Sequence, residues 1–385
     1  MEEERIFWVA WAQIPGVGSI LLQRLQQHFG SLAVAWSASA MQLAQVQGFG
    51  RQLGAKITAE RSRLNPETRY RQHLQKNPQF WTPADPDYPR LLLEIPDPPP
   101  LLYYRGQIDR EENLGIRPLV GIVGTRHPSE YGKRWTRRMS AVLAKCGFTV
   151  VSGMAAGIDS EAHIGCIESA CRTIAVFGTH LDKIYPVANR TLFQKIVSHG
   201  LVLSEHPSGT RTRPEHFAQR NRIIAGLSRA VLVMEAPQRS GALITARVAN
   251  EFGRDVFALP GRLEDYTFQG CLRLLKNGAE MIVNEEELVA MLGGMPKLDH
   301  PQQLSLFQKT PASETSEPSA SPAASMPELE PQLQRVWKAI ATEDAPFDAI
   351  VEAAAMDAAT VSSALLQLEL LGYVEQLPGM RYRRS

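Results

Sequence analysis

Residues 118–163 read PLVGIVGTRHPSEYGKRWTRRMSAVLAKCGFTVVSGMAAGIDSEAH and carry the clearest structural pattern in the chain. Two short apolar runs, Leu119–Val123 and Phe148–Ser152, flank an amphipathic segment, Ser129–Lys145. Apolar strands that alternate with amphipathic helices are typical of a parallel sheet covered on both faces. The stretch therefore predicts a strand–helix–strand unit.

The same alternation continues to about residue 284. The other predicted strands are Thr173–Phe177, Leu201–Glu205, Ala230–Glu235, Val256–Leu259 and Met281–Val283. The other predicted helices are Ser160–Ala170, Thr191–His199, Pro214–Leu227, Gly241–Phe252 and Cys271–Asn277. We predict that residues 117–293 form an α/β domain with a Rossmann-like, doubly wound, mostly parallel sheet.

Residues 1–70 read as short helices. Two similar turns, Gln13–Ser19 (QIPGVGS) and Val46–Arg51 (VQGFGR), each precede an apolar helical face. The doubling resembles tandem helix-hairpin-helix motifs, in which a glycine turn lets backbone N–H groups approach a phosphate. A small helical bundle that uses glycine for tight turns explains the pattern as well. We predict a helical, helix-hairpin-helix or SAM-like domain.

Two segments lack the composition of a folded core. Residues 71–116 contain Asp85–Pro89 and Pro96–Pro100 and are predicted to be an extended connecting segment. Residues 294–328 are rich in Pro, Ser, Ala and Glu and are predicted to be a flexible linker.

Residues 329–385 follow winged-helix order. Three amphipathic segments precede a hairpin over Gly372–Tyr382. The third segment, Thr360–Leu371, contains no Arg or Lys, whereas a DNA-reading helix normally carries basic residues. We favour a protein-contact role for this winged-helix-like domain over nucleic-acid binding.

Charge is uneven along the chain, although the net charge is only +1. Residues 117–280 hold 22 basic against 13 acidic side chains, and residues 281–385 hold 7 against 15. A basic centre suggests an anionic partner, although charge alone fits an ordinary solvated surface equally well.

The chain shows none of the sequence signs of export or membrane insertion. Its four cysteines form no CxxC or zinc spacing, its start is acidic, and no apolar run approaches the roughly 20 residues of a membrane span. We therefore expect a cytoplasmic protein that has no membrane segment.

Loops that suit phosphate follow four of the predicted strands. They begin at Gly124-Thr-Arg126, Ser152-Gly153, Gly178 and Gln238, and the last contains Ser240-Gly241. Small residues at a helix start let N–H groups reach an anion, and open parallel sheets bind ligands beyond their carboxyl ends. Any one loop is weak support, but four on one rim predict an anion site.

The crossover before the fifth predicted strand adds Arg211, Arg213, His216, Arg220 and Arg222. Guanidinium groups suit phosphate contacts and base stacking. A single arginine would be read as part of a solvated helix face, but the cluster beside Arg126 favours nucleic acid.

Signs of catalysis are weak. The sequence has no GxGxxG, P-loop, HExxH or GxSxG motif, and its histidines are dispersed. Ser152 has no assignable base and is interpreted as a phosphate or backbone ligand, and Asp159 as a helix cap. We expect no catalytic residue, no metal site and no cofactor.

The central region resembles the DNA-processing protein A (DprA/Smf) family. The matching blocks are Val123–Arg126, Ser152–Asp159 with His163, Ile174–Gly178 with Tyr185-Pro186, Ser204–Pro207, Phe217–Ser228, Ser240–Ala246 and Val256–Gly261. They occur in order over roughly residues 80–290, and their joint occurrence is specific.

The resemblance implies a binding protein and not an enzyme. Such proteins coat single-stranded DNA during natural transformation, protect it, help to load the RecA recombinase and typically form homodimers through the Rossmann-like domain. Arg126 should be a principal phosphate contact in a basic pocket. The predicted DNA-binding residues are Gly124, Thr125, Arg126, Ser152, Gly153, Lys183, Arg190, Arg220, Arg222, Ser240 and Gly241.

Two positions depart from the family pattern. Val187 stands where a basic residue often follows Tyr-Pro, and Leu272 stands where asparagine is usual.

An alternative function is that of a nucleotide-processing enzyme, such as a nucleoside-phosphate glycosidase, although Gln238–Thr245 lacks the Pro-Gly-Gly-x-Gly-Thr loop and following glutamate of those enzymes. A pure protein adaptor is a third reading, but it leaves the basic rim unexplained.

Overall fold

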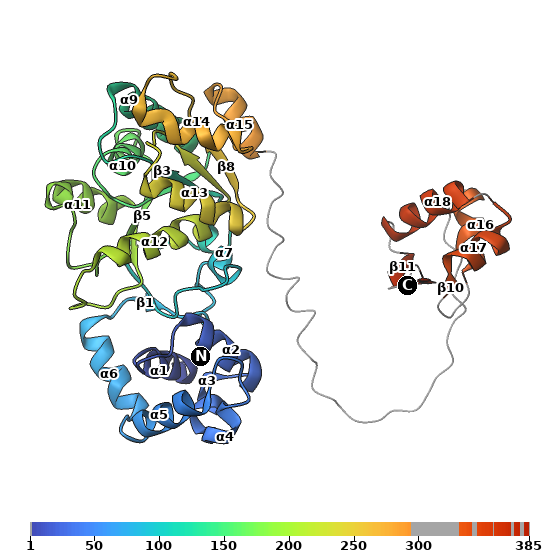
Figure 1. The fold of residues 1–385 in the computed structure, drawn as a ribbon, viewed down its shortest axis with the longest axis horizontal. Helices are drawn as coiled ribbons and strands as arrows, with labels where there is room; N and C mark the ends of the chain where they lie inside the picture. The colour runs from blue at the N-terminus through green and yellow to red at the C-terminus, as the bar shows by residue number, and fades with distance from the viewer. Residues whose placement is uncertain are drawn as a thin grey trace. The chain divides into compact units, whose positions relative to one another are not determined.

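The computed structural model describes residues 2–293, 331–340, 345–356, 358–370, 373–377 and 381–384. The described residues up to 293 form one compact unit, and those from 331 onward form a second. The predicted linker, residues 294–328, lies outside the described residues. Figure 1 shows both units.

A mostly parallel sheet is the centre of the first unit. Within residues 2–293 its strands are β1 (Phe80–Trp81), β2 (Leu102–Gly106), β3 (Leu119–Val123), β4 (Thr149–Ser152), β5 (Thr173–Phe177), β6 (Leu201–Ser204), β7 (Ala230–Val233), β8 (Asp255–Ala258) and β9 (Glu280–Met281). They are ordered β1-β2-β6-β5-β4-β3-β7-β8-β9. All neighbouring pairs from β6 to β9 are parallel, whereas β1 and β2 pair antiparallel at one edge.

The chain reverses its direction of travel across the sheet at β3. It moves outward from β3 through β4 and β5 to β6, then returns to the other side of β3 to form β7, β8 and β9. Because parallel crossovers are right-handed, the two directions place their helices on opposite faces. The point between β3 and β7 is therefore a topological switch point, where open α/β sheets bind ligands.

Helices cover both faces of this sheet (Figure 1). They are α7 (Arg90–Leu93), α8 (Arg110–Asn113), α9 (Glu130–Lys145), α10 (Ile158–Glu168), α11 (Arg190–His199), α12 (Pro214–Leu227), α13 (Gly241–Glu251), α14 (Gln269–Lys276) and α15 (Glu285–Gly293), with single 3-10 turns at Val187–Asn189 and Tyr266–Phe268. Strands β3 to β7 are buried along their whole length, as the uniformly apolar runs predicted. The predicted Rossmann-like fold is confirmed.

Six helices precede the sheet and pack against its edge. They are α1 (Glu2–Ala12), α2 (Ser19–Phe29), α3 (Leu32–Ser37), α4 (Ala40–Leu43), α5 (Arg51–Ser62) and α6 (Pro66–Lys76). The two predicted glycine turns share one backbone geometry. Gly16 and Gly48 have φ of 93° and 95°, and the N-cap residues of α2 and α5 are both glycines with an extended backbone. Trp8 and Trp11 of α1 share an apolar core with Phe80 of β1.

The predicted connecting segment, residues 71–116, differs from the prediction. It contributes β1, β2 and two short helices, and the predicted boundary at residue 70 falls inside α6. Trp81 of β1 stacks on Tyr104 of β2, with ring centroids 4.1 Å apart. The prolines of Asp85–Pro89 and Pro96–Pro100 lie between β1 and β2, so the two strands form on either side of them.

The second unit has winged-helix order. It consists of α16 (Pro331–Ala339), β10 (Ala345–Pro346), α17 (Phe347–Ala354), α18 (Ala358–Leu370), β11 (Val374–Leu377) and β12 (Arg381–Arg384). The predicted three helices and hairpin are present, and β10 adds a third strand beside β12. Val336, Ile350, Leu365 and Leu368 form its buried core.

Candidate nucleic-acid interface

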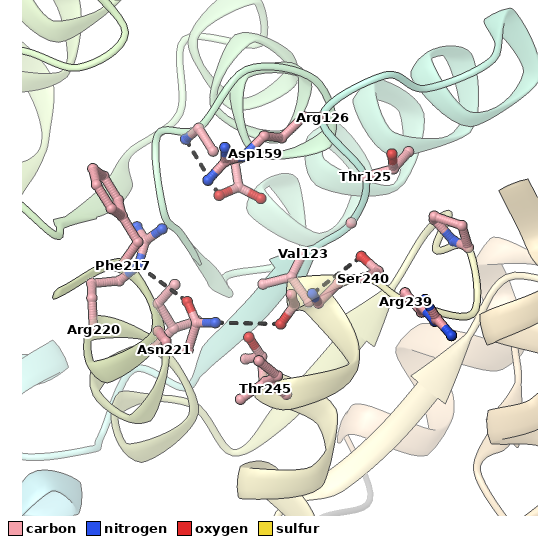
Figure 2. Close-up of a pocket in the computed structure, with 18 of the residues that line it drawn as sticks. Val123, Thr125, Arg126, Asp159, Phe217, Arg220, Asn221, Arg239, Ser240 and Thr245 are labelled. Atoms are coloured by element: carbon pink, nitrogen blue, oxygen red, sulfur yellow. Dashed lines mark hydrogen bonds between the residues drawn. The ribbon is translucent and has the colours of Figure 1, made fainter. Parts of the chain in front are cut away.

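A pocket of about 410 Å³ opens at the carboxyl ends of β3 and β7, at the topological switch point. Figure 2 shows that residues of the loop after β3, the start of α10, α12 and the loop before α13 surround it. This is the place that the order of the strands predicts for a ligand.

The loop after β3 is held rigidly by Glu235, which follows β7. The Thr125 N–H donates to the Glu235 carbonyl at 2.7 Å. The buried Glu235 carboxylate accepts hydrogen bonds from Ser129. The Ser129 N–H lies 3.0 and 3.1 Å from the two carboxylate oxygens, and the Ser129 hydroxyl donates at 2.8 Å. Ser129 in turn caps α9. The loop between these anchors exposes Arg126 and His127 at the pocket.

Arg126 is exposed, and in residues 2–293 it forms no intramolecular hydrogen bond or ion pair. Arg239, in the loop after β7, is likewise exposed at the pocket and unpaired within that range. Both guanidinium groups are therefore available to an external anion. Charge-assisted hydrogen bonds from guanidinium to phosphate are among the strong ones.

The start of α13 completes the basic side of the pocket. Ser240 caps this 11-residue helix by accepting the Ala242 N–H at 3.3 Å. The Asn221 side chain donates to the Gly241 carbonyl at 3.3 Å and so ties α12 to α13. A Cβ at Gly241 would meet nothing within 4 Å, so its backbone faces open space. The amide groups of a helix N-terminus favour an anion at that position.

Arg220 lines the pocket, but its side chain is almost completely buried. Its guanidinium is buried and donates to the carbonyls of Gly153 and Val176, and its Nε donates to Asn221 Oδ1 at 3.2 Å. Burial raises the pKa of the neighbouring Asp159 carboxyl, while the charge of Arg220 acts in the opposite direction. Arg220 therefore fixes the loop after β4 through its hydrogen bond to the Gly153 carbonyl.

The small residues around β4 serve close packing. A Cβ at Gly153 would lie 2.1 Å from Arg220, and one at Gly124 would lie 2.5 Å from Ile158. The buried Ser152 hydroxyl donates to the Ile122 carbonyl at 2.6 Å. Ser152 and Gly153 thus lie behind the pocket and do not line it.

The remaining predicted residues lie elsewhere. Lys183 is exposed on the segment between β5 and α11, and Arg190 is the exposed first residue of α11. The side chain of Arg222 is 15% exposed and forms ion pairs with Asp97 at 3.1 Å and with Glu205. The structure therefore gathers six of the eleven predicted residues around the pocket. They are Gly124, Thr125, Arg126, Arg220, Ser240 and Gly241.

Sequence reasoning missed several pocket residues. Arg239, Asn221 and Phe217 line the pocket but were not among the predicted contacts. Arg239 directly precedes Ser240, and Asn221 directly follows Arg220, so position in the chain was the available signal. The interpretation of Asp159 as a cap was wrong, because the N-cap of α10 is Gly157.

Two kinds of feature are absent from the described residues. They contain no cluster of three or more His, Cys, Asp and Glu side chains that could hold a metal ion. They also contain no helix that is long and apolar enough to cross a membrane.

Comparison with known proteins identifies the family. A family model for DNA recombination-mediator protein A matches residues 79–293, and one for the DprA winged helix domain matches residues 320–380. The chain belongs to the DprA/Smf family. It is 52% identical to Protein Smf of Synechocystis, with 99% of each chain covered.

DprA/Smf proteins of known structure share the fold. The chain resembles the crystal structure of DprA from Streptococcus pneumoniae with a TM-score of 0.65 and 33% identity, covering 75% of this chain and 98% of that one. DprA from Helicobacter pylori, whose structure was described for its single-stranded DNA binding mode, gives a TM-score of 0.50 and 32% identity. The match covers 56% of this chain and 95% of that one.

The two departures from the DprA/Smf pattern fall outside the pocket. Val187 is 70% exposed on the segment between β5 and α11, and the nearby cations in sequence are Lys183 on that segment and Arg190 at the start of α11. Leu272 lies in α14 and does not line the pocket. Neither departure removes a side chain from the pocket itself.

Proposed function

We propose that this protein binds single-stranded DNA without sequence specificity in the pocket between the β3 and β7 loops. Bound in this way, it protects the strand and helps to load the RecA recombinase during natural transformation and recombination. The observation that carries the proposal is the pair of exposed guanidinium groups, Arg126 and Arg239, which have no ion-pair partner within residues 2–293 and lie on the two sides of the switch point.

The chemistry of the pocket fits phosphate better than base edges. Two guanidinium groups and the N-terminus of α13 present positive charge and N–H donors, which suit the backbone common to all sequences. Its volume of about 410 Å³ lies within the usual range for small-ligand sites. A flexible single strand can place one nucleotide into such a pocket, whereas a stiff duplex cannot.

We assign the protein two macromolecular partners besides DNA. These are RecA and a second copy of the chain, paired through the Rossmann-like domain, and membership of the DprA/Smf family supports both proposals. We place the protein in the cytoplasm. The free thiols of Cys146, Cys166, Cys171 and Cys271 agree with a reducing compartment.

The proposal is tested by fluorescence anisotropy with a labelled thymidine 20-mer and a duplex of the same length at two salt concentrations. The single strand should bind more tightly, and its affinity should fall as salt rises. Equal affinity for the two forms would contradict the proposal. Release of free base from mononucleotides, followed by chromatography, would instead favour the nucleotide-processing alternative.

A further inference from the structure

Two aromatic side chains form a contact at one side of the pocket. Phe217 of α12 lines the pocket, and Figure 2 shows it on α12 with Arg220 and Asn221. The ring of Tyr185, from the segment between β5 and α11, lies with its centroid 5.3 Å from that of Phe217, at an interplanar angle of 51°.

The two rings differ in exposure. Tyr185 is 48% exposed, whereas Phe217 is only partly accessible. Phe217 packs over Gly178 at the end of β5, where an added Cβ would lie 2.9 Å from its ring. The half-buried Phe217 ring therefore supports the more exposed Tyr185 ring, and part of Tyr185 remains open to a ligand.

Each ring of this aromatic pair belongs to a part of the structure that carries exposed cations. Arg126 and Arg239 belong to the pocket that Phe217 lines, Lys183 is exposed on the same segment as Tyr185, and Arg190 is exposed at the start of the following helix, α11. The contact between the two rings therefore joins the basic pocket to a second basic segment. Alternating cations and exposed rings are typical of surfaces that bind single-stranded nucleic acid.

We propose that Tyr185, supported by Phe217, is a stacking platform for one unpaired base of a strand whose phosphates occupy the pocket. The inference rests on the proposed function and adds a contact to the base. Stacking accepts every base, so it keeps binding independent of sequence. It also favours single strands, because the bases of a duplex are already stacked and paired.

The test compares two labelled strands of equal length and charge, oligothymidylate and an abasic deoxyribose-phosphate strand, on the full-length protein. Tyr185→Leu should weaken binding of oligothymidylate about tenfold and leave binding of the abasic strand unchanged. Tyr185→Phe keeps the ring and should bind both strands as the wild type does. Tyr266→Leu is the matched control, because that 66% exposed tyrosine follows β8, on the other side of the pocket from β5, and does not line it.

The outcomes separate this inference from the proposed function. If Tyr185→Leu weakens binding of both strands equally, or of neither, the stacking platform is wrong while single-strand binding stands. If the wild type binds no single strand, both proposals fall. Melting temperatures of the variants should match that of the wild type, and a large drop for Tyr185→Leu would overturn the assignment of a binding role.

Discussion

Replacement of Arg126 by alanine should remove one phosphate contact without disturbing the fold. The side chain is exposed and has no intramolecular ion pair within residues 2–293, so the free energy of unfolding should change by less than about 0.5 kcal/mol. A charge-assisted hydrogen bond contributes about 1.5–3 kcal/mol, and exposure places this one near the lower limit. The affinity for single strands should therefore fall about tenfold.

The salt dependence of binding distinguishes a lost phosphate contact from an indirect effect. Each neutralised phosphate of a single strand contributes about 0.7 to the slope of log K against log salt concentration, so Arg126→Ala should reduce that slope by about this amount. The assay is an anisotropy titration at four salt concentrations. Arg247→Ala is the control, because Arg247 is exposed on α13, outside the pocket, and pairs with Glu251. An unchanged slope in Arg126→Ala, or an equal reduction in Arg247→Ala, would refute the assignment.

Three further predictions concern stability. Gly153→Ala should destabilise the protein by about 1–3 kcal/mol in chemical denaturation, because its Cβ would overlap Arg220, whereas Gly241→Ala faces open space and should not. Arg222→Met should cost about 2–3 kcal/mol by leaving carboxylates unpaired, yet leave single-strand affinity unchanged. Burial lowers the pKa of His163 to about 3, so the unfolded chain binds more protons below pH 6.5, and stability measured by urea unfolding should fall by about 2 kcal/mol between pH 7 and pH 5.

Much of the fold could be predicted because its strands are short and apolar throughout. Leu119–Val123 and Thr173–Phe177 were predicted with the observed bounds, since apolar runs between amphipathic helices leave little choice of structure. The short strands β1 and β2 could not be predicted. Strand β2 forms because it pairs with β6, about 100 residues later, and β1 forms because it pairs with β2, and no local pattern carries that information.

The candidate site was predictable only to the level of its loops. The order of strands places the loops after β3 and β7 together, so Arg126 and Ser240 meet at one pocket. The role of each residue within the loops depends on distant partners. Arg222 pairs with Asp97, 125 positions away, and Gly153 is small because Arg220 lies against it. Sequence shows a glycine or an arginine but not what it contacts.

We propose that the pocket between the β3 and β7 loops holds the phosphate backbone of a single strand. The most direct test is a crystal structure of the protein with a short oligothymidylate. A phosphate should lie within hydrogen-bond distance of the Arg126 or Arg239 guanidinium group and near the N-terminus of α13. A strand bound on another surface, with this pocket empty, would contradict the claim.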